Sequence, residues 1–169
     1  MMDRKTASIR PYRATALAFS IFFAFLNVHA DEIATQLVVY KTPTCGCCVG
    51  WIKHLEAHNF KTEVYHPENI SVLKQEKGIK RQFQSCHTGV SKNGHVFEGH
   101  IPARFINEFL VSPPRNSIGL SVPGMPVGSP GMEVDDKFLP YKVLTLMKDG
   151  SIEVFKEVNS MTEQYDPAG

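Results

Sequence analysis

The sequence predicts one α/β domain, and three observations support this prediction. A β-branched, apolar segment at 36–40 is followed by a segment with helical spacing of apolar residues, and then by a second strand-like segment at 62–65. Two further strand pairs surround tight Asn-Gly and Asp-Gly turns, at 93–94 and 149–150. Residues 31–169, which follow an N-terminal leader, are enough for a single apolar core.

Residues 1–30 have the pattern of a cleaved signal peptide. Basic side chains precede an apolar run at 14–28, and Val28-His29-Ala30 ends the run with small residues at the two positions that a signal peptidase reads. The run has about 15 residues, whereas a bilayer span needs about 20, so an uncleaved membrane anchor is the weaker alternative. We expect an exported protein whose mature chain begins near Asp31 and has no membrane association.

The charge balance of the mature chain argues against nucleic-acid binding. Removal of residues 1–30 leaves 14 basic and 16 acidic side chains, a net charge of −2. No run of like charges reaches five residues, and no basic stripe is present in the sequence.

Three cysteines stand at the predicted start of the first helix. The strand at 36–40 stops at the turn 42–44, and apolar residues then recur at helical spacing until Asn59. Thr44 is the predicted N-cap, so Cys45, Cys47 and Cys48 fall in the first turn. Unpaired backbone N–H groups and the positive end of the helix dipole stabilise a thiolate there. His54 and His58 lie farther along this helix and are expected to be solvated.

The remaining elements follow in order. A short helix is expected at 70–77, a hairpin at 88–98, a helix at 103–110 that starts with Pro102, a Pro/Gly/Met-rich loop at 122–132, and a terminal hairpin at 141–155. The domain is predicted to span 31–158, with a flexible tail at 159–169.

This order resembles the thioredoxin-like fold: a βαβ unit with a Cys-x-Cys-Cys motif at the first helix N-terminus, an inserted hairpin and a C-terminal β-hairpin. Cys45 and Cys48 form the Cys-x-x-Cys pair at the redox position of that fold. The resemblance implies that Pro126 is the proline, often cis, that precedes the third strand and packs against the cysteines.

The sequence also resembles the CopG copper-resistance family, exported metal-binding domains, over about residues 37–155. The blocks that carry this resemblance are Tyr40-Lys41-Thr42-Pro43-Thr44-Cys45-Gly46-Cys47-Cys48, Ser85-Cys86-His87-Thr88, Glu98-Gly99-His100-Ile101-Pro102-Ala103 and the loop block at 119–133. The resemblance implies periplasmic copper handling, with copper bound through cysteine and redox chemistry as a further option. Its implied partners are copper ions and other periplasmic copper-handling proteins.

The ligand types agree with copper but leave zinc open. Soft thiolates select Cu(I), Zn(II) or iron–sulfur clusters. A tetrahedral zinc site from Cys45, Cys48, Cys86 and His87 leaves Cys47 surplus, whereas Cu(I) accepts bridging thiolates and allows a polynuclear cluster. Purely structural disulfides are the weaker alternative, because a bridge between neighbours Cys47 and Cys48 closes almost no loop.

Histidine and methionine could complete such a site. His87 and His100 fall within the family blocks and are candidates for ligands or for partners of ligands. Met125 and Met132 are soft ligands on a polar loop, although methionine also fills irregular gaps in a core.

Two functions from different classes follow from these residues. The first is Cu(I) sequestration by Cys45, Cys47, Cys48 and Cys86, with His87, His100, Met125 and Met132 as candidate further ligands. The second is a thiol-disulfide or copper oxidoreductase in which Cys45 attacks and Cys48 resolves. The third neighbouring cysteine argues against simple dithiol exchange, because it offers a competing disulfide.

Overall fold

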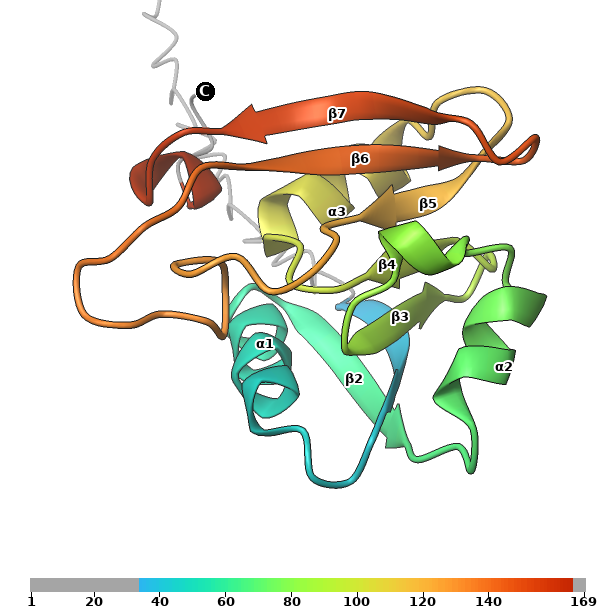
Figure 1. Cartoon of the computed structure of the whole chain (residues 1–169), viewed down its shortest axis with the longest axis horizontal. Helices are drawn as coiled ribbons and strands as arrows, with labels where there is room; N and C mark the ends of the chain where they lie inside the picture. The colour runs from blue at the N-terminus through green and yellow to red at the C-terminus, as the bar shows by residue number, and fades with distance from the viewer. Residues whose placement is uncertain (1–33, 166–169) are drawn as a thin grey trace, which may run out of the picture. The chain divides into compact units, whose positions relative to one another are not determined.

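The computed structural model describes residues 34–165, so the predicted signal peptide and the start of the mature chain lie outside the described residues. The described chain forms a mixed seven-stranded sheet in the order β2-β1-β3-β4-β5-β6-β7, together with three α-helices (Figure 1). The predicted α/β class is therefore confirmed. Among residues 34–165, no helix is both long enough and apolar enough to span a bilayer.

The predicted βαβ unit is present at the start of the domain. β1 (Thr35–Lys41) pairs in parallel with β2 (Phe60–Tyr65), and α1 (Gly46–Ala57) connects them. Helix α1 begins one position later than predicted, because Cys45 rather than Thr44 is the N-cap, and no side chain in the described part of the chain caps the helix. Asn59 has a positive φ of 63°, which ends the helix as expected.

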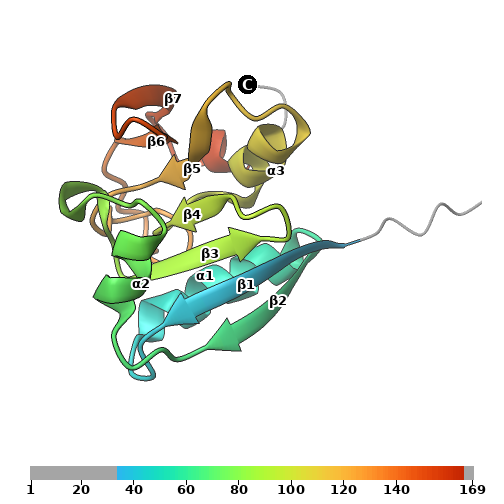
Figure 2. The ribbon, with the colours of Figure 1, turned by 90° about the vertical axis from the view of Figure 1, so that its right-hand side faces the viewer.

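The second group of elements brings the chain back beside β1. α2 (Ile70–Glu76) is capped by the Asn69 side chain, and the 3-10 helix η1 (Arg81–Phe83) leads to β3 (His87–Ser91). β3 pairs antiparallel with β1 and with β4 (Val96–Glu98), which confirms the predicted hairpin. Helix α3 (Ala103–Val111) follows, with Pro102 as its N-cap rather than its first residue. Figure 2 shows β2, β1, β3 and β4 in a row with α1 behind them.

The terminal hairpin joins the same sheet through a strand that the sequence did not predict. β5 (Ser117–Ser121) pairs in parallel with β4 and antiparallel with β6 (Tyr141–Met147), and β6 pairs with β7 (Ile152–Val158). β5 contains serines and a glycine in place of an apolar run. Gly119 is required there, because a Cβ at this position would lie 1.8 Å from the Val96 carbonyl oxygen.

The main core lies on one face of the sheet, where α1 and α3 pack together. Trp51 and Leu55 of α1 and Phe105 and Phe109 of α3 belong to one buried cluster, which also includes Phe97 of β4. The neighbouring Val96 belongs to a smaller cluster with Ile79 and Leu146. Because successive strand residues point to opposite faces, this smaller cluster covers the other side of the sheet.

The segment after β7, which was expected to be flexible, makes defined contacts in its described part. It forms the 3-10 helix η2 (Thr162–Gln164), and Gln164 is buried. Tyr141 donates a hydrogen bond to Gln164 Oε1 at 2.5 Å, and Gln164 Nε2 donates to the Gly128 carbonyl at 2.8 Å. Residues 166–169 lie outside the described part of the chain.

His54 connects the two core helices and is not solvated as the sequence suggested. Its Nε2 accepts a hydrogen bond from the Ala103 N–H, the first residue of α3, at 2.9 Å. Burial, followed by the charge of His58, lowers the pKa of His54 from 6.5 to about 4. A neutral His54 therefore satisfies one of the free N–H groups at the start of α3.

We predict that His54 makes stability depend on pH. The His54 ring takes up a proton near pH 6.5 in the unfolded chain but only near pH 4 in the folded chain. Its contribution to the free energy of unfolding is therefore complete above pH 6.5 and is lost as the pH falls towards 4. We measure the free energy of unfolding of the metal-free proteins in urea at pH 7 and at pH 4.5. Between these two pH values it should fall by up to about 3 kcal/mol more in the wild type than in His54→Gln. Parallel losses in the two proteins would contradict this role.

Candidate metal centre

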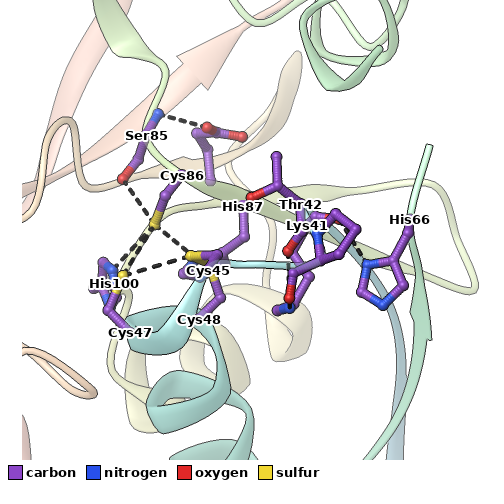
Figure 3. Close-up of a disulfide and its surroundings, with 12 residues drawn as sticks. Lys41, Thr42, Cys45, Cys47, Cys48, His66, Ser85, Cys86, His87 and His100 are labelled. Carbon is purple, nitrogen blue, oxygen red and sulfur yellow. Dashed lines mark hydrogen bonds between the residues drawn. A yellow bond between two sulfur atoms is a disulfide. The ribbon is translucent and has the colours of Figure 1, made fainter. Parts of the chain in front are cut away.

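Four sulfur atoms gather where α1 begins and β3 begins. Cys45 and Cys48 form a disulfide, and the thiol of Cys47 lies 3.5 Å from Cys45 Sγ and 3.9 Å from Cys86 Sγ (Figure 3). All four sulfur atoms lie within 4.8 Å of one another. Cys48 is fully buried, whereas the other three are partly exposed. The sulfurs therefore form one group that can be reached from solvent.

His100 is oriented toward this group. Its Nδ1 lies 2.8 Å from the Pro130 carbonyl, and its Nε2 lies 3.3 Å from Cys86 Sγ. A carbonyl can only accept, so Nδ1 carries the proton and the Nε2 lone pair faces Cys86. Histidine ligands of metals in proteins are commonly oriented by such a second hydrogen bond.

His87 has a different environment. It is fully buried, its ring lies 4.2 Å from that of Trp51, and its Nδ1 is 3.2 Å from Cys86 Sγ. Its Nε2 has no hydrogen-bond partner among residues 34–165. Burial holds the pKa of His87 well below its usual value, so the ring is neutral. An unpartnered nitrogen costs less as an acceptor than as a buried N–H, so this environment favours Nδ1–H as a donor to the Cys86 sulfur.

The Cys86 thiol resists ionisation in the absence of a cation. Burial, followed by the proximity of Cys47, raises its pKa to about 11. At neutral pH this sulfur is therefore a thiol in the metal-free chain. A metal ion would displace its proton, because metals bind the thiolate form of cysteine.

A buried ion pair holds the chain on both sides of Cys86. Lys74 is 2 % exposed and Glu98 is fully buried, and the two side chains form a salt bridge. Lys74 Nζ donates to the Ser85 carbonyl at 2.6 Å, and Glu98 Oε1 accepts from the Ser85 N–H at 2.6 Å. Glu98 Oε2 accepts from the Thr88 hydroxyl at 2.5 Å. The pair therefore fixes Ser85 and Thr88, between which Cys86 and His87 stand.

The charge state of Glu98 follows from these contacts. Burial raises the pKa of Glu98, and the Lys74 charge and the hydrogen bonds from Lys74, Thr88 and Ser85 oppose that effect. Three donors hydrogen-bond to the Glu98 carboxylate. Glu98 and Lys74 are therefore both charged, because each then has a partner in the interior.

The Pro/Gly/Met-rich loop at 122–132 packs against α1 beside the cysteines. A Cβ on Gly131 would lie 2.4 Å from the Trp51 amide nitrogen and 2.8 Å from the Cys47 carbonyl, so only glycine fits. The same loop approaches the other cysteine segment, because Ser85 Oγ donates to the Gly124 carbonyl. Met125, the residue after Gly124, is 53 % exposed, and Met132, the residue after Gly131, is partly buried.

The expected role of Pro126 is wrong. Residues 34–165 contain no cis peptide bond, and the strand after Pro126 begins only at Tyr141. Cys86, not Pro126, directly precedes the strand that pairs with β1. The Lys74–Glu98 pair was missed, because one residue lies on a helix and the other on a strand 24 positions away, and no local pattern connects them.

The fold and the site define a class of protein: a small mixed α/β domain with a cluster of cysteines and histidines close enough to share a metal ion. The family model described as "Protein of unknown function, DUF411" matches residues 83–132. Two solved structures described as copper resistance protein copG, Form 1 and Form 2, are 39% and 40% identical to this chain. Each match covers 75% of this chain and 99% of the other, with a TM-score of 0.70. The chain therefore belongs to the CopG-type copper-resistance family. A comparison with curated proteins gives no match.

We predict that the Lys74–Glu98 pair is essential for stability. Glu98→Gln leaves the Lys74 charge buried without a partner and should lower the free energy of unfolding by about 3–5 kcal/mol. Glu108→Gln is the matched control, because Glu108 is 45% exposed in its pair with Lys156. Urea unfolding should place the midpoint of Glu98→Gln far below that of Glu108→Gln. Equal midpoints would contradict the assignment.

Proposed function

We propose that this chain is an exported copper-binding protein for copper resistance that holds Cu(I) through Cys45, Cys47, Cys48 and Cys86. The observation that supports this most directly is the approach of the four sulfur atoms within 4.8 Å of one another in a chain of the CopG-type family. Binding through all four requires reduction of the Cys45–Cys48 disulfide by an external dithiol, which gives up two electrons and two protons and becomes a disulfide itself. Metal binding then releases thiol protons.

The position of Cys47 favours Cu(I) over a single zinc ion. The zinc alternative uses Cys45, Cys48, Cys86 and His87 and has no use for Cys47. Yet Cys47 Sγ lies close to both Cys45 Sγ and Cys86 Sγ, which is the arrangement that a thiolate bridging two copper ions needs. We therefore propose a polynuclear Cu(I) site.

The neighbouring side chains have separate proposed roles. The Nε2 lone pair of His100 faces Cys86 and suits a fifth ligand. His87 suits a hydrogen-bond donor to the Cys86 thiolate. Met125 and Met132 stand on the loop that packs beside both cysteine segments, so their thioethers are candidates for copper capture from the solvent side.

The wider proposals concern compartment and fold. The leader at 1–30 supports export to the periplasm, where other copper-handling proteins would be partners of a mature domain at 31–158. The arrangement β2-β1-β3-β4, with a parallel β1–β2 pair and α3 after the hairpin, supports a thioredoxin-like unit to which β5, β6 and β7 are added.

Copper stoichiometry tests the binding function. After reduction and anaerobic loading, the mature protein should hold more than one copper ion per chain by metal analysis against protein concentration. Cys47→Ser should lower this ratio, because it removes the bridging sulfur. His87→Asn should retain the ratio, since His87 is proposed to act through a hydrogen bond.

The zinc alternative predicts the reverse pattern. It requires one metal ion per chain, unaffected by Cys47→Ser and lost in His87→Asn. That result would overturn the copper proposal.

A thiol-disulfide oxidoreductase is the second candidate, and the Cys45–Cys48 disulfide at the start of α1 favours it. In this reaction an external dithiol first reduces the Cys45–Cys48 bond. The partly exposed Cys45 thiolate then attacks a substrate disulfide, forms a mixed disulfide with one substrate sulfur and releases the other as a thiolate. The buried Cys48 thiolate then displaces the substrate thiol, so that the substrate is reduced and the Cys45–Cys48 bond is formed.

We predict that, if this reaction occurs, metal-free protein with dithiothreitol reduces insulin faster than dithiothreitol alone. Cys45→Ser and Cys48→Ser should abolish the acceleration, whereas Cys86→Ser should retain it. Turbidity of the precipitating insulin chain measures the rate. A rate equal to that of free dithiol removes this candidate.

A further inference from the structure

The Pro/Gly/Met-rich loop contains a turn at 126–132, the loop turn, that is closed by its own hydrogen bonds. The Gly128 N–H donates to the Met132 carbonyl at 2.9 Å, and the Met132 N–H donates to the Ser129 carbonyl at 2.8 Å. The buried Ser129 hydroxyl donates to the Pro126 carbonyl at 2.6 Å. These bonds tie the loop turn into one unit, so a contact at one of its residues also fixes the others.

The loop turn contacts the metal centre through two of its residues. The Pro130 carbonyl accepts from His100 Nδ1 at 2.8 Å, and this bond directs the His100 Nε2 lone pair toward Cys86. Gly131 packs so closely on α1 that a Cβ there would lie 2.8 Å from the Cys47 carbonyl. The position of the loop turn therefore decides how His100 is oriented.

The loop turn is held at Gly128 by a side chain from the end of the described chain. Gln164 in η2 is 1 % exposed, and its Nε2 donates to the Gly128 carbonyl at 2.8 Å. Its Oε1 accepts from the Tyr141 hydroxyl of β6 at 2.5 Å. The Gln164 amide therefore joins the loop turn to the sheet through two buried hydrogen bonds, which are costly to break without a replacement.

The segment that carries Gln164 is itself held in place. Arg104 of α3 donates from Nη1 to the Glu163 carbonyl at 2.8 Å. The neighbouring Tyr165 also reaches the loop, because its hydroxyl donates to Glu133 Oε1 at 3.4 Å, but this contact is exposed and long. Gln164 is therefore the buried link between the loop turn and the two elements α3 and β6.

We infer that Gln164 is a positioning residue for the metal centre, which anchors the loop turn and thereby orients His100 as a ligand. It acts through the Gly128 and Pro130 carbonyls and not on the metal ion itself. Loss of a contact that orients a histidine ligand commonly lowers metal affinity by about 10- to 100-fold. The ligand part of this inference rests on the proposed function, whereas the effect on the metal-free loop turn and His100 does not.

The first experiment uses metal-free protein. Gln164→Leu removes the donor to Gly128, and NMR relaxation should show the backbone order parameters of Gly128 and Gly131 falling from about 0.85 to below about 0.6. The His100 Nδ1–H should exchange with water about tenfold faster, because its acceptor is no longer held. Thr162→Ala is the matched control and should change neither quantity, since Thr162 is an exposed residue of the same 3-10 helix.

Urea unfolding of each variant separates anchoring from folding. Gln164→Leu leaves the buried Tyr141 hydroxyl without its acceptor, which destabilises the fold. If Gln164→Leu does not fold, the double variant Tyr141→Phe with Gln164→Leu replaces it. Apolar groups then stand in for both partners, so no hydroxyl is left unpaired while the donor to Gly128 is still absent.

The second experiment measures the Cu(I) affinity of the reduced protein by competition with a chromogenic chelator. Gln164→Leu should weaken binding by about tenfold, and Thr162→Ala should match the wild type. In a His100→Asn background, Gln164→Leu should cause no further loss, because the ligand that it orients is gone. A merely structural role would lower the affinity equally in both backgrounds.

The outcomes separate this inference from the proposed function. Unchanged order parameters and unchanged His100 N–H exchange in Gln164→Leu overturn the inference, whatever the copper result. An equal loss of affinity with and without His100 also overturns it, since Gln164 then acts by another route. If neither the wild type nor any variant binds copper but Gln164→Leu still frees the loop turn and speeds the His100 exchange, the positioning of His100 stands and the copper proposal fails.

Discussion

Antiparallel pairing of β1 with β3 is the constraint on which the site depends. The end of β1 leads into α1, and the start of β3 follows Cys86. The Lys41–His87 register therefore brings the two cysteine segments to the same end of these two neighbouring strands. A sulfur 39 positions from Cys47 in sequence thereby comes within 3.9 Å of it. A slip of one residue in either strand would place Lys41 and His87 on opposite faces of the sheet.

Charge compensation explains how so many polar side chains are buried at this end of β1 and β3. Glu98 neutralises Lys74 and, in the same contacts, fixes Ser85 and Thr88. The Lys41 ammonium donates to the backbone carbonyls of Thr42 and Pro43. Neutral His87 and His100 add nitrogen atoms without adding charge. The buried polar groups around Cys86 are therefore either paired, as Lys74 and Glu98 are, or neutral, as His87 is.

Local patterns predicted the elements that depend on local chemistry. The Cys-x-Cys-Cys motif, the βαβ unit and both hairpins could be predicted, because turn residues and apolar spacing mark them directly. β5 was missed, since its two serines interrupt the apolar pattern and Gly119 is needed for its close approach to Val96. The acceptor role of His54 could not be predicted either, because it depends on how α1 meets α3. The Pro126 assignment was wrong because the strand that pairs with β1 is β3, which begins at His87, well before Pro126.

The two proposed functions would use the same sulfur atoms in states that exclude each other. In the Cys45–Cys48 disulfide, two of the four sulfurs have no thiolate to offer, so a soft metal meets only Cys47 and Cys86 together with His100. Reduction returns Cys45 and Cys48 to thiols, so that all four sulfurs are available for a metal ion that displaces their protons. Under the proposed function, reduction of the disulfide and binding of Cu(I) would therefore favour each other, because copper binds only the reduced sulfurs. An oxidising compartment opposes that form, and bound copper would protect it there by occupying the sulfurs.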